Sequence, residues 1–325
     1  MSPNTQTRAE AAPPAIPPAP LQPARHASSS RIWRMARMNI LLNYRVRIAF
    51  FFTFVWPMMW FFVYFLIFGN GHPLAVAALM GPLMSLEIIS NALFGFSVQL
   101  VSMRERDMLR RYHLSPITAT AMVGSRMLSS YILFMPLVIV QYVLAVWWFH
   151  MPVMGNLLAL FVVFSLAFLA LSAVGLVIAC IVDTVQEATV WNQILFFGLL
   201  FLSGTTVPLV SLGHFVQRLA LFLPPTLMIL GSAMLMLGNT GWGPNLPEII
   251  GLLLIMFACW ALGVALFRWE KEKKSGRRDR IRAALALVPI LAVGLWLNFS
   301  PGFQKIYQSY LAESAAAFNA AVAKK

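Results

Sequence analysis

Residues 127–182 read MLSSYILFMPLVIVQYVLAVWWFHMPVMGNLLALFVVFSLAFLALSAVGLVIACIV, and none of these 56 residues is Asp, Glu, Lys or Arg. A helical span through a bilayer takes about 20 apolar residues, so this stretch is long enough to cross a membrane twice. Other stretches without these four residue types recur at 48–86, 88–103, 188–217, 219–247, 249–267 and 283–304. We therefore expect an all-α integral membrane protein.

The composition agrees with this fold class. Hydrophobic residues make up 60% of the chain and charged residues 11%, against about 25% charged residues in a typical soluble domain. A net charge of +13 would favour nucleic-acid binding in a soluble protein. Here the cations are where membrane topology requires them, so we expect membrane lipids as partners and no nucleic acid.

The predicted spans are 48–68, 75–103, 127–149, 157–182, 188–207, 249–267 and 283–299. Between the fifth and sixth spans, residues 208–247 are mostly apolar but are interrupted by Pro208, Pro224 and Pro225. Broken backbone must not face lipid. We therefore expect short re-entrant helices that dip into the outer leaflet and pack on the bundle.

Lys and Arg residues predict the orientation. Seven precede the first span, five lie in 104–126 and eight lie in 268–282, which places twenty of the twenty-four on one side. Lys and Arg are concentrated in cytoplasmic loops. The N-terminus is therefore expected in the cytoplasm and, with seven spans, the C-terminus outside.

The chain divides into five predicted parts. They are a disordered cytoplasmic tail (1–30), a membrane-surface helix (31–47), a transmembrane domain (48–268), a basic cytoplasmic loop (269–282), and an extra span with an outer amphipathic tail (283–325). Apolar residues of the tail, from Phe303 to Val322, follow helical i, i+3, i+4 spacing.

No catalytic or metal-binding pattern is visible. The sequence has no P-loop, no H-E-x-x-H and no G-x-S-x-G, so we expect no bound cofactor and no nucleotide hydrolysis by this chain. Glu87 is the only carboxylate deep in a predicted span. Such residues are expensive in a membrane and often functional. Glu87 and Asn91 either lie on a substrate path, or Glu87 hydrogen-bonds a neighbouring helix or faces an aqueous cavity.

The run RERDMLRRYHLSPI at 104–117 mixes both charge signs with an apolar face that includes Leu109. It is either a solvated positive-inside loop or a short amphipathic helix that contacts a cytoplasmic partner. This run resembles the R-E-R-x-x-x-x-L-R/K-x-(T/S)-P-(L/I) loop of ABC-2 type transporter permeases. LSGTTVPL at 202–209, followed by LPP at 223–225, is similar to the L-S-G-x-x-x-P-L … L-P-L-T motif of that family, and NALFG at 91–95 also matches.

The resemblance covers about residues 31–268 and implies a six-span bundle with re-entrant helices after span five. Two such subunits, either identical or related, would work with two separate cytoplasmic ATPase subunits, which bind ATP and Mg²⁺. The implied ATPase-coupling residues are Arg104, Glu105, Arg106, Asp107, Leu109 and Pro116, with Asp183 and Glu187 in a second cytoplasmic contact. The implied gate residues are Gly204, Pro208, Pro224 and Pro225.

By this resemblance, the chain is expected to be the permease subunit of an exporter in a bacterial inner membrane. It would move an amphipathic drug-like or lipidic molecule out of the cytoplasm or the inner leaflet. Export of a lipid-linked polysaccharide or another lipid is an alternative within transport. An intramembrane lipid-modifying enzyme and a scaffold that only anchors an ATPase are alternatives from other classes. The extra segment 283–325 departs from the family pattern, which says nothing about its role.

Overall fold

The computed structural model describes residues 29–45, 51–68, 73–109, 117–152, 155–236, 242–269 and 276–322. Every regular element in these ranges is helical, which confirms the all-α fold class. The first half contains α1 (Ser29–Arg45), η1 (Phe51–Val55), α3 (Trp56–Phe68), α4 (Pro73–Ser90), η2 (Asn91–Ser97), α5 (Val98–Glu105), α7 (Ala119–Trp147) and α8 (Leu157–Ile181). The second half contains α9 (Val185–Leu202), η3 (Leu209–Ser211), α10 (His214–Ala220), α11 (Pro224–Met236), α12 (Leu246–Ala265), α13 (Arg277–Ala284), α14 (Leu287–Phe299) and α15 (Pro301–Val322).

Six of the described helical stretches are long and apolar enough to cross a membrane. They are Val76–Glu105, Ala119–Trp147, Leu157–Ile181, Val185–Leu202, Leu246–Ala265 and Ile281–Phe299. A shorter apolar helix, Trp56–Ile67, lies within the first predicted span. Helices α10 and α11 meet at a bend of 94°, as expected for a broken, re-entrant segment after span five.

Two span boundaries differ from the prediction for local reasons. The helix predicted to start at 127 begins at Ala119, because Thr118 caps it and Arg126 is buried within it. The span predicted over 188–207 is displaced to Val185–Leu202. It starts earlier because the Thr184 side chain caps its first turn, and it ends earlier because Gly204 adopts a positive φ.

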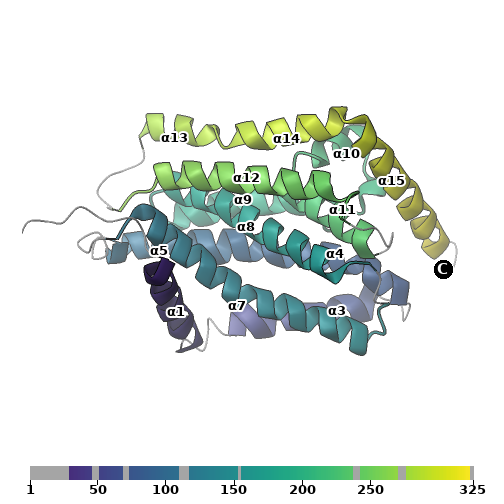
Figure 1. Cartoon of the computed structure of the whole chain (residues 1–325), viewed down its shortest axis with the longest axis horizontal. Helices are drawn as coiled ribbons and strands as arrows, with labels where there is room; N and C mark the ends of the chain where they lie inside the picture. The colour runs from purple at the N-terminus through teal and green to yellow at the C-terminus, as the bar shows by residue number, and fades with distance from the viewer. Residues whose placement is uncertain are drawn as a thin grey trace, which may run out of the picture.

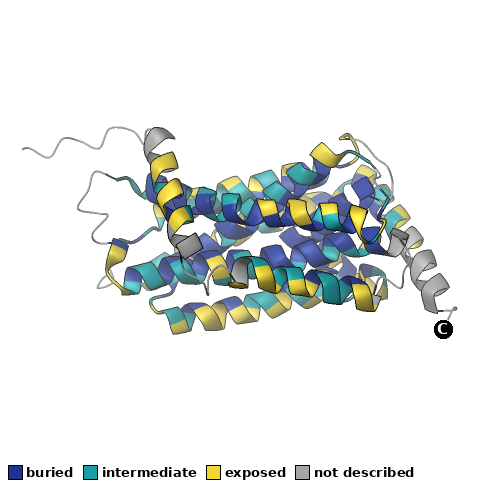
Figure 2. Ribbon diagram, turned by 90° about the horizontal axis from the view of Figure 1, so that it is seen from below, coloured by how far each residue is buried: buried dark blue, intermediate teal, exposed yellow. Residues whose placement is uncertain are grey.

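Helix α8 lies at the centre of the bundle. Its sequence is apolar on all sides and 15 of its residues are buried, as expected for a helix surrounded by other helices. Its most extensive partner is α12, and it also packs against α11 and η2. A Cβ added at Gly263 of α12 would lie 2.6 Å from Leu176 of α8, so this glycine allows the two helices to approach closely. Figure 2 shows buried residues inside the bundle and exposed ones on its outer faces.

The two ends of the bundle are built differently (Figure 1). One end carries α1, the end of α5 and the start of α13, and α1 lies across the long axis. The opposite end carries α10 and α15. The predicted surface helix over 31–47 corresponds to α1, which packs against α7 through buried Ala36 and Asn39 and leaves Arg34 and Arg37 exposed. Of the predicted disordered tail over 1–30, residues 1–28 lie outside the described residues, and Ser29 and Ser30 form the start of α1.

The extra C-terminal helices pack on the bent α10–α11 pair. An added Cβ at Gly294 of α14 would lie 2.1 Å from Phe222 in the bend. Asn298 donates to the Arg218 carbonyl oxygen at 3.2 Å, and the Tyr307 hydroxyl donates to the Gln217 carbonyl oxygen at 3.2 Å. Burial raises the pKa of Tyr307, so its hydroxyl stays a neutral donor. These three contacts, made by residues 217, 218 and 222, hold α14 and α15 against the bend.

Candidate functional site

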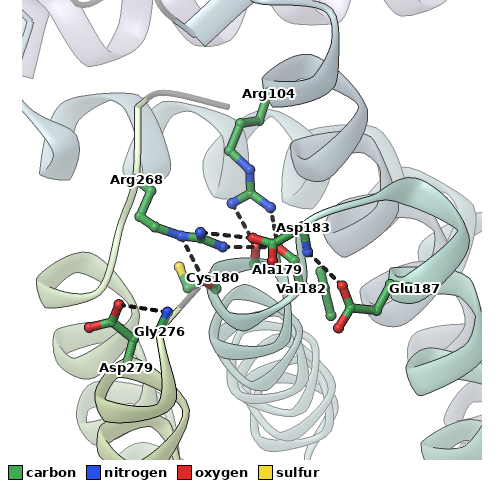
Figure 3. Close-up of polar contacts among 9 residues, drawn as sticks. All are labelled: Arg104, Ala179, Cys180, Val182, Asp183, Glu187, Arg268, Gly276 and Asp279. Atoms are coloured by element: carbon green, nitrogen blue, oxygen red, sulfur yellow. Dashed lines mark hydrogen bonds and ion pairs between the residues drawn. The ribbon is translucent and has the colours of Figure 1, made fainter. Parts of the chain in front are cut away.

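Two arginines bind the C-terminal end of α8 (Figure 3). The Arg104 guanidinium, from the end of α5, donates to the Ala179 carbonyl oxygen at 3.0 Å and to that of Val182. Arg268, which follows α12, donates to the Cys180 carbonyl oxygen at 3.1 Å and to that of Val182 at 3.0 Å. The last carbonyls of a helix have no partner within the helix and carry partial negative charge. The two buried cations donate hydrogen bonds to these carbonyls and place positive charge next to their partial negative charge.

Acidic side chains bind the N-terminal end of α9, only a few residues further on. The Glu105 carboxylate accepts from the Val185 N–H at 2.8 Å, and the Thr184 hydroxyl accepts from the Glu187 N–H at 3.1 Å. Glu187 in turn accepts from the Asp183 N–H at 2.9 Å. The N-terminus of a helix carries exposed N–H donors and partial positive charge, so acids are stabilising there.

An ion pair closes this arrangement. The Arg268 guanidinium lies 2.9 Å from the Asp183 carboxylate, and the Arg268 side chain is only 6% exposed. The arrangement therefore joins the ends of α5, α8, α9 and α12. We call these residues (Arg104, Glu105, Asp183, Thr184, Glu187 and Arg268) the four-helix clamp.

The predicted coupling residues have different surroundings. Arg104 and Leu109 are buried, Glu105 is partly buried, and Arg106 and Asp107 are exposed beside the clamp. Asp107 has a φ of 54° and ends α5 in the left-handed region, where Asp is tolerated better than most residues. Pro116 lies outside the described residues. The sequence does not single out Arg268, because a cation that follows an apolar run indicates membrane topology and not a specific contact.

The predicted gate residues surround a sharp reversal after α9. Gly204 has a φ of +88°, and an added Cβ there would lie 2.7 Å from the Leu209 side chain. The positive φ requires glycine, as the sequence suggested. Pro208 is exposed and precedes η3, whereas Pro224 and Pro225 are buried and begin α11.

Buried hydroxyls fasten this reversal to its neighbours. The Thr205 hydroxyl lies 2.6 Å from that of Ser203 and 3.1 Å from that of Ser85 in α4. The Thr226 hydroxyl of α11 donates to the Ser203 carbonyl oxygen at 3.1 Å. The Ser-Gly-Thr part of the motif therefore ties α9 to both α4 and α11.

A family comparison covers the chain from α1 to α11. The model of the ABC-2 type transporter family matches residues 30–237, well over half of the chain. The chain belongs to the ABC-2 type transporter family. Comparison with curated proteins finds no match. The resemblance seen in the motifs is thus confirmed, and the chain is the membrane subunit of an ABC transporter. The α12–α15 segment follows the matched region.

The NALFG motif of this ABC-2 subunit, at 91–95, forms a π-helical turn. Such turns release a backbone carbonyl from the regular helix pattern and are frequent at functional sites. Here the Leu93 carbonyl oxygen accepts from the buried Asn192 side chain of α9 at 2.8 Å. An added Cβ at Gly175 of α8 would lie 2.7 Å from the Ala92 carbonyl oxygen. The turn is thus fixed by both α8 and α9, a contact that the motif alone did not indicate.

Glu87 is buried one turn before that motif. Its carboxylate accepts from the Gln141 side-chain nitrogen of α7 at 2.8 Å, so the predicted hydrogen bond to a neighbouring helix exists. Asn91 is partly exposed, and its side chain lies beside Gly95. Within the described residues, no group of three or more His, Cys, Asp or Glu side chains could hold a metal ion.

Proposed function

We propose that this ABC-2 subunit belongs to an exporter driven by a separate ATPase subunit. The exporter would move an amphipathic, drug-like or lipidic molecule out of the cytoplasm or the inner leaflet. ATP and Mg²⁺ would be bound by the ATPase. The observation that carries the proposal is the four-helix clamp, because it includes Arg104 and Glu105, the first residues of the segment 104–117 that the resemblance implies is the coupling element.

The clamp supplies a mechanical route. A force applied at the exposed Arg106 and Asp107 would reach buried Arg104, which is bonded to α8, and Glu105, which is bonded to α9. Arg268 would carry the same movement to α12. Because these contacts are short and mostly buried, the four helix ends would move together rather than separately.

Helix α9 connects the clamp to the reversal at Gly204. Its 18 residues run from Val185 to Leu202, a length of about 27 Å at 1.5 Å per residue. Displacement of its clamp end would therefore be transmitted to the Leu209–Ala220 region, where the bent α10–α11 pair would cap the exit. Opening of the cap would release substrate on the outer side.

The assembly would contain two membrane subunits, either identical or related, and two ATPase subunits on the cytoplasmic side. We place it in a bacterial inner membrane with the N-terminus inside and the C-terminus outside. Helix α9 has a largely exposed apolar face, with Val190, Trp191, Ile194, Phe197 and Phe201. That face would contact lipid or the second subunit.

The experiment is transport into inside-out vesicles that contain the subunit and its cognate ABC ATPase. ATP-dependent accumulation of fluorescent amphiphiles supports the proposal. Accumulation of a lipid-linked glycan alone would identify the polysaccharide alternative, and lipid modification without transport would identify an enzyme. ATPase binding with no transport of any kind would identify a scaffold.

The clamp has its own test in the same vesicles. Glu105→Ala combined with Asp107→Asn should preserve insertion but lower substrate-stimulated ATP hydrolysis and export together, because the bond to Val185 is lost. Asn at 107 retains tolerance of the left-handed conformation, so Asp107→Asn alone is the control for backbone strain. Normal export by the double variant would show that Glu105 transmits nothing.

A further inference from the structure

Glu87 and Gln141 form a buried acceptor pair between three helices. Glu87 lies in α4 and Gln141 in α7, and both side chains are buried. The Gln141 nitrogen donates to Glu87 Oε1 at 2.8 Å and, at a longer 3.4 Å, to the carbonyl oxygen of Pro57 in α3. Both bonds use the same nitrogen, so the Gln141 amide oxygen points away from them.

Two oxygens of this pair have no donor among the described parts of the chain. They are Glu87 Oε2 and Gln141 Oε1, each fully buried. Leaving a buried acceptor unsatisfied is costly, and an uncompensated buried charge costs more. Protonation of Glu87 would remove the buried charge, and the new O–H could donate to an acceptor such as Gln141 Oε1. A positively charged hydrogen-bond donor would take the place of that proton and could donate to both oxygens of the ionised pair.

The other buried carboxylate in a span, Glu248, also has no donor for either of its oxygens among the described residues. It differs from Glu87 because it is in the first turn of α12, where the helix N-terminus supplies partial positive charge. Glu87 instead lies near the C-terminal end of α4, and the chain continues directly into η2. No helix terminus therefore offsets its charge, which makes Glu248 a matched control.

Aromatic side chains form an apolar layer next to the pair. Phe61 is one helical turn from Pro57, and its ring lies 5.8 Å from that of Phe149, which follows α7. Phe65 lies 5.2 Å from the same Phe149 ring. An acceptor pair with an aromatic layer beside it suits a molecule with a cationic head and an apolar body.

We propose that Glu87 and Gln141 bind the ammonium group of the transported molecule, so that the substrate class is a primary or secondary amine with an apolar body. Glu87 would form a charge-assisted bond and Gln141 Oε1 a neutral one to the same nitrogen. This inference rests on the proposed transport function, because it specifies the substrate of that function. Binding itself requires no ATPase.

The test measures equilibrium binding of radiolabelled octylammonium and 1-octanol to the purified full chain in nanodiscs, with empty nanodiscs subtracted. Wild type should bind octylammonium saturably and in preference to octanol. Glu87→Gln should weaken octylammonium binding about 10- to 100-fold, the range expected for a lost charged hydrogen bond. Gln141→Leu should weaken it about 2- to 10-fold, as for a neutral bond. Glu248→Gln should leave it unchanged.

Equal wild-type affinity for octylammonium and octanol would overturn the proposal, and this comparison does not depend on any variant folding. Unchanged octylammonium binding by folded Glu87→Gln would also overturn it. If Glu248→Gln weakens octylammonium binding as much as Glu87→Gln does, the cause is a general loss of negative charge and not a specific site, and the proposal is overturned. If octylammonium binds as expected but the vesicles show no ATP-dependent transport, the proposed exporter function is wrong, while the proposed binding site is supported.

Discussion

Substitution of Gly204 tests the reasoning about the gate. Its φ of +88° costs an L-residue about 1–3 kcal/mol. An added Cβ would lie 2.7, 3.1 and 3.3 Å from three side-chain carbons of Leu209, which is itself buried. Overpacking of this kind costs about 1–3 kcal/mol. Gly204→Ala should therefore lower the free energy of unfolding by about 2–6 kcal/mol in total.

A glycine in the preceding helix provides the control. An added Cβ at Gly198 of α9 would meet nothing within 4 Å, so Gly198→Ala should stabilise the helix by up to about 1 kcal/mol. The steric contribution to the loss of stability in Gly204→Ala can be separated from the backbone contribution with Leu209→Ala. In the double variant Gly204→Ala/Leu209→Ala the collision is gone, so a coupling of about 1–3 kcal/mol should appear.

The assays are unfolding of the purified subunit in mixed micelles titrated with sodium dodecyl sulfate, and ATP-dependent transport in vesicles. We expect Gly204→Leu to impair transport more than folding, because its side chain would displace Leu209 and hence the bent α10–α11 pair. A wild-type rate of transport by Gly204→Leu would show that Gly204 has no role in the gate. An unfolding free energy for Gly204→Ala equal to that of Gly198→Ala would refute the strain argument.

Three further predictions concern the clamp, the C-terminal helices and the topology. Arg268→Met should lower the free energy of unfolding by about 1–3 kcal/mol, because the Cys180 carbonyl loses its buried donor and the partly exposed Asp183 loses its ion pair. Exposed Arg106→Met should change it by less than about 0.5 kcal/mol; equal values would contradict the clamp. Tyr307→Phe removes the bond to the Gln217 carbonyl and should cost about 1–3 kcal/mol in the same titration, while an unchanged midpoint would mean that α15 does not hold the bend. Gln308→Cys, at an exposed position of α15, should react with a membrane-impermeant thiol reagent in intact cells, since both native cysteines are buried; labelling only after the membrane is opened would place the C-terminus in the cytoplasm.

The coarse fold could be predicted from the sequence because membrane insertion depends on composition along a segment. The run at 127–182 without Asp, Glu, Lys or Arg is enough to predict a membrane protein, and the Pro residues between 208 and 225 indicate the break after span five. The sequence also predicts that glycine is required at 204, since a reversal after a helix often requires a positive φ. Each of these features depends on neighbours in the chain, and the family motifs reinforce them.

The partners of the polar side chains were decided by the tertiary structure. The bond of Gln141 to Glu87 joins residues 54 positions apart, and that of Arg268 to Cys180 joins residues 88 apart. Hydropathy places each residue at a depth but does not say which helix faces it, because the rotation and crossing angle of each helix depend on packing with all the others. The chain sequence by itself therefore determined that this is a helical membrane subunit with a broken segment. Helix packing decided which charges meet, and with them the clamp and the acceptor pair.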